Sequence, residues 1–578
     1  CQTAGCAEHT ALLSNTLSPE LSPCDDFSAF VCAGWKPGRS RVTDVASELK
    51  WRWLVNIYHL FYNGTLKLPR SIKARTALKS CLERPENVTS KHMGQLKSFM
   101  RDRGIPWPSK PPADKHPLDV LLDLEINWRC PLWFRIRFVL DKSQRTLLIS
   151  PSKPPAHARE PSFEMTGPEE MGGDFLRDTL SLLKLFYGMY GQPLAPTTTK
   201  TLAEMHVHIA KDLTRALRSG RDTRGYLKLK DIGRLTPSVD AATWLQFLRA
   251  HTPSVFNLTT DTDVFVENTE TIKVLRSVLK KQSFEDILNV IGWQFALRYT
   301  DIVAKNVPSM TLEDGNDKMF AFVCERQLSE MYGELLSSEY VLRNFPMEQK
   351  IKVSRFLNKV KNYVIGKLQA LGSGERLNKE ALDSASRLKF DIWPSIAIGG
   401  IVKDTFPGNE ASFIDYWIET RKASRGLLGT IEYDDMFNGL DNFRPPFSYR
   451  QRQNAMLVGL EVLSSPLYYV DVPDAVSYGG LGAKIAGHIV RALYPEDNAT
   501  TSGEPGLEAA FDLLDLDGPG KMSVKEARQV FFVTYCVASC GSQDSTCNAA
   551  MRSFEPFVRA FSCSSSSYMG GGKTSTFF

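Results

Sequence analysis

The chain has 578 residues, with 70 Lys and Arg against 65 Asp and Glu, which gives a formal net charge of +5. A net positive charge this small on a chain this long argues against nucleic acid as the main partner. The longest uncharged apolar run, Ile392 to Val402, is too short to span a bilayer, which takes about 20 residues of helix. The sequence therefore predicts no membrane span in this chain. An apolar content of 43% is ordinary for a globular protein, so the sequence also predicts no global disorder.

Eleven cysteines gather mainly at the two ends of the chain, and no C-x-x-C pair occurs among them. That spacing argues against structural zinc and thioredoxin-like redox sites, and favours disulfides formed in an oxidising compartment. Four N-x-T sequons agree with secretion: Asn63, Asn87, Asn257 and Asn498. The sequence therefore predicts an extracellular glycoprotein, either secreted or the ectodomain of a membrane-anchored protein.

The predicted elements are mostly helices. The first strand pair is expected at Leu132 to Val139 and Thr146 to Ser150, joined as a hairpin. Apolar residues recur with a period near 3.6 in three later segments, which predicts helices there. These segments are 320–336, 347–371 and 524–537. A second strand pair is expected at Met456 to Leu463 and Leu467 to Val472. The fold class is thus mostly α with minor β.

Several motifs resemble one family. Cys1, Cys6 and the segment PCDDFSAFVCAGW from Pro23 to Trp35 are similar to the opening of the neprilysin and endothelin-converting-enzyme family of zinc metallopeptidases. Further matches keep the same order along the chain, at 127–132, 320–332, 454–469, 477–487 and 554–569. The resemblance implies a two-lobed ectodomain stapled by disulfides. A degenerate peptidase lobe is expected at about 1–30 plus 395–578, and a helical covering lobe at about 31–394.

The resemblance also implies which cysteines pair. The implied disulfides are Cys1–Cys6, Cys24–Cys563, Cys32–Cys540 and Cys81–Cys324. Cys536 and Cys547 could pair locally. Cys130 is then the odd cysteine, and it is a candidate for a bridge to another chain.

The zinc motif of such a peptidase is missing. A catalytic zinc needs three protein ligands and a carboxylate base, and H-E-x-x-H places two ligands and the base on one helix. The sequence has no H-E-x-x-H, and the matching place reads Gly487, His488, Ile489, Val490 and Arg491. Glycine has no ligand atom, and a guanidinium brings a positive charge to the place of a cation. Shifting the alignment by one residue puts Ile489 at the base, so neither alignment gives a site.

The family's third zinc ligand and its substrate-binding strand also differ from the expected pattern. Glu504 is the candidate remnant of the third zinc ligand, but the aspartate expected one helical turn later is absent. His488 and Glu504 would supply two ligands at most. The family's substrate-binding edge strand falls at Pro446 to Tyr449, where proline has no N–H to donate. The sequence therefore predicts no catalytic residues and no bound zinc.

Two other features have plainer interpretations. His206 and His208 stand two residues apart on a predicted helix, so their side chains should point apart rather than share a metal. The basic segment from Arg215 to Arg234 could bind an anionic surface, although a solvated helix and loop explains it better.

The function expected from these observations is that of a pseudoenzyme: a catalytically inactive neprilysin-like extracellular protein that binds a peptide or protein partner. Two alternatives stay open. One is a residual metal-dependent peptidase with a rebuilt site, and the other is a secreted interaction or immune-evasion protein that uses its outer surface. The sequence identifies neither the ligand nor the oligomeric state.

Overall fold

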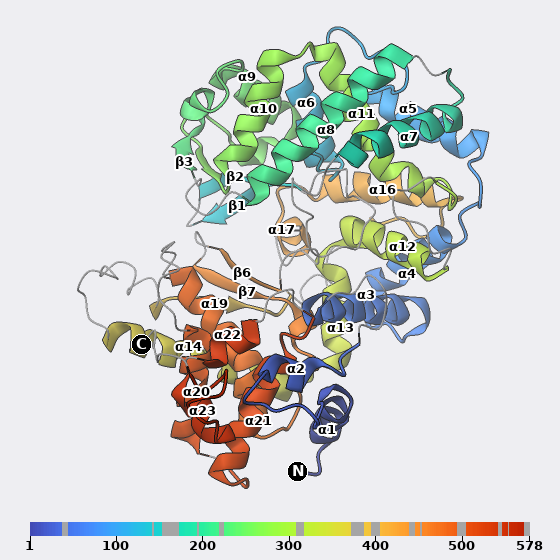
Figure 1. The fold of residues 1–578 in the computed structure, drawn as a ribbon. Coiled ribbons are helices and arrows are strands. Elements are labelled where there is room, and N and C mark those ends of the chain that lie inside the picture. Colours follow the sequence, from blue (N-terminus) through green and yellow to red (C-terminus); the bar gives the residue numbers. More distant parts are fainter. Residues whose placement is uncertain are drawn as a thin grey trace. The chain divides into compact units, whose positions relative to one another are not determined.

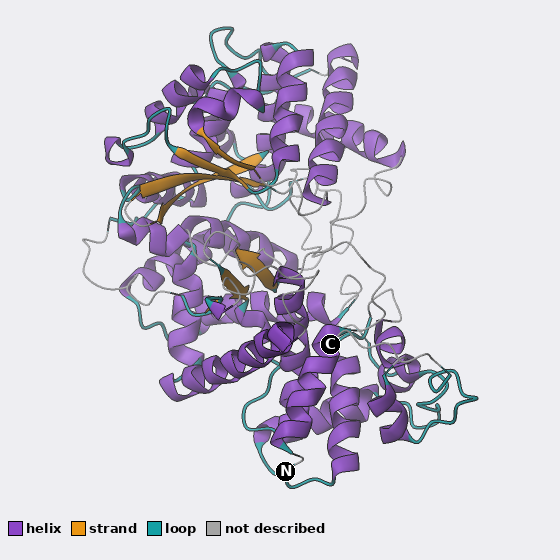
Figure 2. Cartoon of the chain, turned by 90° about the vertical axis from the view of Figure 1, so that its left-hand side faces the viewer, coloured by secondary structure: helices purple, strands orange, loops and turns teal. Residues whose placement is uncertain are grey.

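The fold is mostly helical with two small sheets, as the fold class predicted (Figures 1 and 2). The computed structural model describes residues 1–36, 44–141, 144–152, 173–193, 196–218, 225–307, 317–370, 386–394, 405–437, 446–450, 454–493, 504–518, 520–541, 546–552 and 554–571. The chain divides into two compact units. Unit 1 comprises 1–56, 340–393 and 440–578, and unit 2 comprises 57–339 and 394–439.

These bounds differ from the expected lobes. Residues 31–56 and 340–393 were expected in the covering lobe but belong to unit 1, and 395–439 belong to unit 2. The packing of two helices gives the reason. Helix α14 (Met347–Ala370) packs on α19 (Ala483–Leu493) and α20 (Pro505–Asp517), whereas α16 (Phe413–Gly426) packs on α4 (Pro69–Leu82) and α12 (Asp317–Tyr332).

Unit 1 holds both ends of the chain and one three-stranded sheet. Its sheet has the order β5-β7-β6, with β5 parallel and β6 antiparallel to the central strand. Strands β6 and β7 are in register from Phe447 opposite Val458 to Arg450 opposite Ala455. Besides α14, α19 and α20, the unit contains α1 (Ala4–Thr16), α2 (Phe27–Cys32), β5 (Lys389–Asp391), β6 (Phe447–Arg450), β7 (Ala455–Val458), η8 (Leu460–Val462), α18 (Asp474–Ser477), η9 (Tyr478–Gly482), α21 (Val524–Val537), α22 (Thr546–Arg552) and α23 (Glu555–Phe561).

Unit 2 is built around a four-stranded sheet of order β1-β2-β4-β3. Strands β1 and β2 form the predicted hairpin, β2 pairs in parallel with β4, and β4 pairs antiparallel with β3. The elements are α4, α5 (Ser90–Asp102), α6 (Pro117–Leu122), η1 (Asp123–Asn127), β1 (Phe134–Asp141), β2 (Gln144–Pro151), α7 (Gly173–Met189), α8 (Pro196–Arg218), β3 (Gly225–Lys228), η4 (Leu229–Arg234), α9 (Ala241–His251), η5 (Ser254–Phe256), β4 (Asp263–Val266), α10 (Thr269–Lys281), α11 (Phe284–Tyr299), η6 (Thr300–Ile302), α12, α16 and α17 (Ile431–Phe437). Helices α3 (Val45–Asn63) and α13 (Glu334–Asn344) each begin in one unit and end in the other.

Three predicted elements are wrong in whole or in part. The strand expected at Met456 to Leu463 ends at Val458, and Leu460 to Val462 form the short helix η8 instead. The helix expected at 320–336 ends at Tyr332, because Gly333 adopts a left-handed φ of 55° where a Cβ would lie 2.1 Å from the Met436 carbonyl oxygen. The strand expected at Leu467 to Val472 is not a strand. Its buried residue Tyr469 packs against His9, with ring centroids 5.1 Å apart, instead of facing a neighbouring strand.

Five disulfides staple the chain, and they include the four pairs that the resemblance implied. Cys24–Cys563 and Cys32–Cys540 join the two ends of the chain within unit 1, across separations of 539 and 508 residues. Closing loops this long restricts the unfolded chain strongly in the chain-entropy model. The remaining pairs are Cys1–Cys6, Cys81–Cys324 and Cys536–Cys547.

The odd cysteine, Cys130, is only 1% exposed, and its thiol lies 3.3 Å from the carbonyl oxygen of Trp128. Burial raises the pKa of this thiol to about 12. The bridge to another chain considered for Cys130 is therefore closed off in this fold, because a disulfide needs an accessible thiolate.

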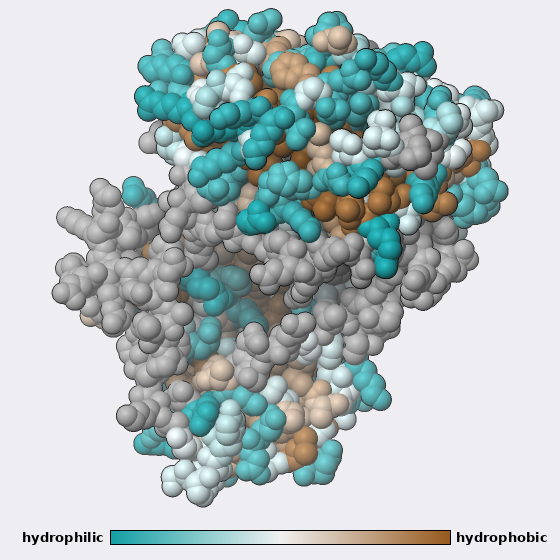
Figure 3. Space-filling view, turned by 45° about the horizontal axis from the view of Figure 1, so that its top comes forward, coloured by the Kyte–Doolittle hydropathy of each residue, from teal (hydrophilic) through white to brown (hydrophobic). Residues whose placement is uncertain are grey.

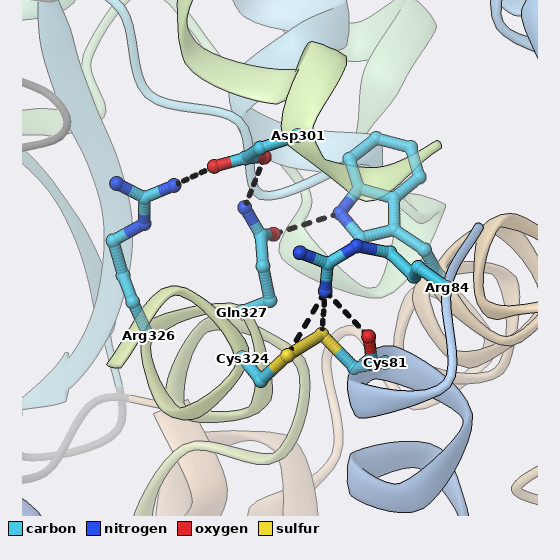
Figure 4. The surroundings of a disulfide bond; sticks show 7 residues. Cys81, Arg84, Asp301, Cys324, Arg326 and Gln327 are labelled. Atoms are coloured by element: carbon cyan, nitrogen blue, oxygen red, sulfur yellow. Dashed lines mark hydrogen bonds and ion pairs between the residues drawn. A yellow bond between two sulfur atoms is a disulfide. The ribbon is translucent and has the colours of Figure 1, made fainter. Parts of the chain in front are cut away.

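Helix α12 carries polar side chains into the core of unit 2 (Figure 4). Around the Cys81–Cys324 disulfide, the Arg84 guanidinium donates to the Cys81 carbonyl oxygen at 2.7 Å and to the Cys324 sulfur at 2.9 Å. Arg326 and Gln327 both donate to the carboxylate of Asp301, at 2.7 and 3.4 Å. These buried groups hydrogen-bond to one another, which lowers the cost of burying them in a low-dielectric interior.

The described surface is mainly hydrophilic on the face that Figure 3 shows, with smaller areas of apolar side chains between. Within the described ranges, every helix is too short or too polar to cross a lipid bilayer.

Unit 1 contains a buried histidine that should make stability depend on pH. The His9 ring nitrogens contact the Tyr469 and Thr534 hydroxyls, each at 3.2 Å, and burial lowers the pKa of His9 from 6.5 to about 4. The unfolded chain therefore binds more protons in this interval. The free energy of unfolding should fall as pH drops from about 6.5 to about 4, by up to roughly 3 kcal/mol from this residue. Urea unfolding at about pH 7.5 and about pH 4.5 measures the loss. His9→Gln should remove part of it, and an identical loss in that variant would contradict the assignment.

Candidate functional site

Helix α19 of unit 1 carries the positions where the resemblance places a zinc motif. Its apolar residues fall on one face at helical spacing and are buried: Ile485, Ala486, Ile489, Val490 and Leu493. Lys484, His488 and Arg491 lie at i, i+4 and i+7, so they share another face. The helix contacts both strand β6 and helix α20, and Figure 1 shows β6 and β7 beside it.

The structure brings three of the four predicted positions together. Arg491 Nη1 lies 3.7 Å from Glu504 Oε1, at the N-cap position of α20. A Cβ built on Gly487 would lie 3.3 Å from both Arg491 Nη2 and Glu504 Oε1. His488 is directed differently, since its ring stacks on Phe447 of β6 with centroids 4.6 Å apart. Gly487, Arg491 and Glu504 thus converge at one point, and His488 faces the strand.

These residues do not fit the zinc that the fold family implies. At the point of convergence stand a glycine with no side chain, a permanently charged guanidinium, and a carboxylate that this guanidinium already pairs. A catalytic zinc takes three neutral or anionic ligands in tetrahedral geometry. Among the described residues, no three His, Cys, Asp or Glu side chains are grouped as a metal site requires.

Lys484 is a residue of this site that the sequence analysis missed. It stands one helical turn before His488, and its ammonium donates to the Ser539 hydroxyl at 2.8 Å and lies 5.6 Å from the Tyr535 ring centroid. Burial lowers the pKa of Lys484 to about 8; nearby Glu504 opposes this shift and Arg491 adds to it. Burial likewise raises the pKa of Tyr535, and Glu504 adds to that shift. The spacing of Lys484 from His488 and Arg491 was visible in the sequence, whereas nothing local marked Tyr535 or Ser539.

A second residue that the sequence analysis missed lies on α20. Glu508 stands one helical turn after Glu504, at the place where the family's aspartate was expected to be lost, and it is only 6% exposed. A carboxylate is therefore kept in the first turn of α20, where the helix dipole favours negative charge. Pro505 precedes it at the first helical position, where a missing N–H costs no hydrogen bond.

Strand β6 is the edge strand that the resemblance placed at Pro446 to Tyr449. It runs from Phe447 to Arg450, and Pro446 stands just before it. The Pro446 carbonyl oxygen accepts a hydrogen bond from the Gly459 amide at 2.8 Å, so the chain stays close to β7 at this end. Within the described ranges, β6 pairs with β7 on one side and with no strand on the other.

The remaining sequence candidates lie in unit 2. His206 is 1% exposed and packs 6.2 Å from the Trp293 ring, whereas His208 is exposed and lies 3.4 Å from Asp212, so the two side chains point apart as predicted. In the basic segment 215–234, residues 219–224 lie outside the described residues. Several of the others pair with carboxylates: Arg215–Asp212, Lys228–Asp263, Lys230–Asp261 and Arg234–Asp231. These pairs suit a solvated surface.

The sequence is similar to those of two known peptidases over most of its length. The chain is 21% identical over 551 residues to human membrane metallo-endopeptidase-like 1, covering 88% of this chain and 70% of that protein. It is 19% identical to mouse endothelin-converting enzyme 1, covering 85% and 67%.

Solved structures with the same fold have lower sequence identity. PepO from Lactobacillus rhamnosus superposes with a TM-score of 0.62 at 13% identity, covering 96% of this chain and 99% of that one. The inhibitor complex of the zinc metalloprotease Zmp1 from Mycobacterium tuberculosis gives 0.62 at 11%, covering 96% and 97%. A chain of the Haemonchus galactose-containing glycoprotein complex gives 0.65 at 13%, covering 98% of each.

A family model supplies the assignment. The model of peptidase family M13 matches residues 23–373, which is more than half of the chain and includes the segment from Pro23 to Trp35 that carried the resemblance. The motifs that fall within this range and the fold agree with that match. The chain is therefore a neprilysin-like member of peptidase family M13.

Proposed function

We propose that this chain is a non-catalytic member of its family that binds a peptide or protein partner outside the cell. One observation carries the proposal: Arg491 and Glu504 form an ion pair beside Gly487, where a catalytic member would hold its metal. A guanidinium at that place both lacks a ligand atom and repels a cation. Without zinc, neither a bound water nor a substrate carbonyl can be activated in the manner of this family.

Strand β6 supports the binding part of the proposal. A strand with one open edge can accept an extended peptide through main-chain hydrogen bonds. Ser448, Tyr449 and Arg450 are each partly exposed on β6, and the Phe447 ring at its start lies against His488 of α19. The scaffold thus keeps a place for a peptide backbone although the chemistry next to it is lost.

The proposed location outside the cell is supported by the disulfides and the glycosylation sites of the chain. Five disulfides suit an oxidising compartment. The side chains of Asn63, Asn87 and Asn257 are exposed, as N-glycans require, and Asn498 lies outside the described residues. Treating protein from a secretory host with a peptide N-glycosidase should convert these asparagines to aspartate. Unmodified asparagine at all of them would contradict the glycoprotein assignment.

The test of inactivity is a cleavage assay with zinc supplied. The full chain is incubated with a mixture of unstructured peptides and excess zinc, with and without a chelator, beside an active zinc peptidase of the same fold. We expect mass spectrometry to find chelator-sensitive products only with the active enzyme. Products that disappear both with chelator and in a Glu504→Gln variant would overturn the proposal, because they would show a metal held at this site.

A further inference from the structure

The basic face of α19 has a charge pattern that the loss of zinc does not explain. Lys484, His488 and Arg491 follow one another at i, i+4 and i+7, so they form a stripe along one side of the helix. A cation-binding site would gain nothing from such a stripe. An anion-binding site would, because neighbouring basic side chains attract a negative group.

The surroundings place this stripe beside the open-edged strand. His488 stacks on Phe447, the first residue of β6, with ring planes 27° apart. Arg491 has 46% of its side chain exposed, so its guanidinium stays accessible next to Glu504. An extended segment lying along β6 would therefore pass close to these basic groups.

Lys484 is the cation of the stripe that forms no ion pair within the described residues. Glu504 forms its ion pair with Arg491. The largely buried ammonium of Lys484 donates to the neutral hydroxyl of Ser539, and no carboxylate of the described residues forms an ion pair with it. An ammonium has three donors, and a buried one is costly unless a negative partner is present. The guanidinium of Arg491 is near enough to lower the pKa of Lys484 further. Glu504 also attracts the Lys484 ammonium, but it is already paired with Arg491, so a direct ion pair for Lys484 would need a second carboxylate.

We propose that the Lys484–His488–Arg491 stripe binds a carboxylate of an extended peptide that lies along β6. This inference rests on the proposed function and names the class of partner: an acidic peptide. The carboxylate accepts charge-assisted hydrogen bonds from the Lys484 ammonium and the Arg491 guanidinium, which are stronger than bonds between neutral groups. It can come from an Asp or Glu side chain or from the C-terminus of the peptide.

Three sets of fluorescein-labelled hexapeptides test the assignment on the full chain by fluorescence anisotropy. The first set has an amidated C-terminus and Glu fixed at a central position. The second has Gln at that position, and the third combines Gln with a free C-terminal carboxylate. We expect either the first or the third set to bind about tenfold or more tightly than the second, and whichever does so identifies the source of the carboxylate.

Variants separate recognition of charge from support of the fold. Arg491→Gln, at an exposed position, should reduce the preference for the carboxylate at least several-fold while leaving thermal unfolding unchanged, and Lys484→Met should do the same if it folds. Lys525→Gln, at an exposed position on α21, is the matched control and should change nothing. If all three sets bind equally to the wild type, the stripe is not an anion site, although peptide binding itself stands. If no set binds, both the inference and the proposed binding function fail.

Discussion

Replacing Glu330 with glutamine should lower the free energy of unfolding by about 3–5 kcal/mol, the cost of breaking a buried ion pair on one side. Glu330 lies on α12 in the core of unit 2 and pairs with two arginines, Arg298 at 2.9 Å and Arg421 at 3.1 Å. All three side chains are at least 90% buried. Burial alone would raise the pKa of Glu330, but the two guanidinium groups hold that pKa at about 2. Glutamine keeps the shape but removes the charge, which leaves two cations in the interior.

Urea unfolding followed by tryptophan fluorescence measures this effect, because Trp417 lies directly below the Arg421 guanidinium, 4.3 Å from it. The matched control is Glu419→Gln on α16. Glu419 pairs with Lys422 at 2.7 Å, but both side chains are about half exposed, so this change should cost less than about 1 kcal/mol. Equal effects of the two variants would contradict the role given to the buried charges.

The second large effect is expected at Gly506, where α20 crosses α19. A Cβ on this residue would lie 2.4 Å from the Ala483 carbonyl oxygen and 2.7 Å from the Gly487 amide nitrogen. Both are backbone atoms, so no side-chain rotation can relieve the clash and the helices must separate. Gly506→Ala should therefore cost about 2–3 kcal/mol, at the upper end of overpacking effects. The same movement would pull Glu504 away from Arg491.

Gly366 on α14 provides the control within the same unit. A Cβ there meets nothing within 4 Å, and the residue lies inside a helix. Gly366→Ala should raise the free energy of unfolding by about 0.5–1 kcal/mol, because alanine loses less backbone entropy than glycine. Thermal unfolding of both variants should thus shift in opposite directions. A neutral result at Gly506 would mean that the helices do not approach as closely as described.

Much of the fold could be predicted, because long periodic segments and ordered motifs carry strong signals. The helices at 347–371 and 524–537 correspond to α14 and α21, and the first predicted strand pair is the β1–β2 hairpin. The short strands β3, β4 and β5 have only three or four residues each, too few to show a pattern. Leu467 and Tyr469 show the opposite error. Their alternating burial looks like a strand, but it arises from packing against neighbouring segments such as α1.

The site residues that lie within one helix could be predicted from the sequence. The contacts that helix makes with distant segments could not. The resemblance placed the degenerate motif at 487–491, and α19 brings Gly487 and Arg491 of that motif to one point beside Glu504. The contact of Lys484 with Ser539, 55 residues away, depends on how α19 packs near the end of α21. No local pattern encodes such a contact. Glu508 is visible in the sequence, but the resemblance implies an aspartate at that place and so does not mark a glutamate.

The absence of a metal site at α19 is the central claim, and zinc stoichiometry tests it most directly. The full chain is incubated with excess zinc and passed through a desalting column. The zinc bound per chain is then measured by inductively coupled plasma mass spectrometry. A variant with Gly487→His, His488→Glu and Arg491→His serves as the positive control, because a side chain at 487 would point at Glu504 and the repelling guanidinium would be gone. We expect close to one zinc per chain in that variant and far less in the wild type. One tightly held zinc in the wild type, lost on Glu504→Gln, would contradict the account.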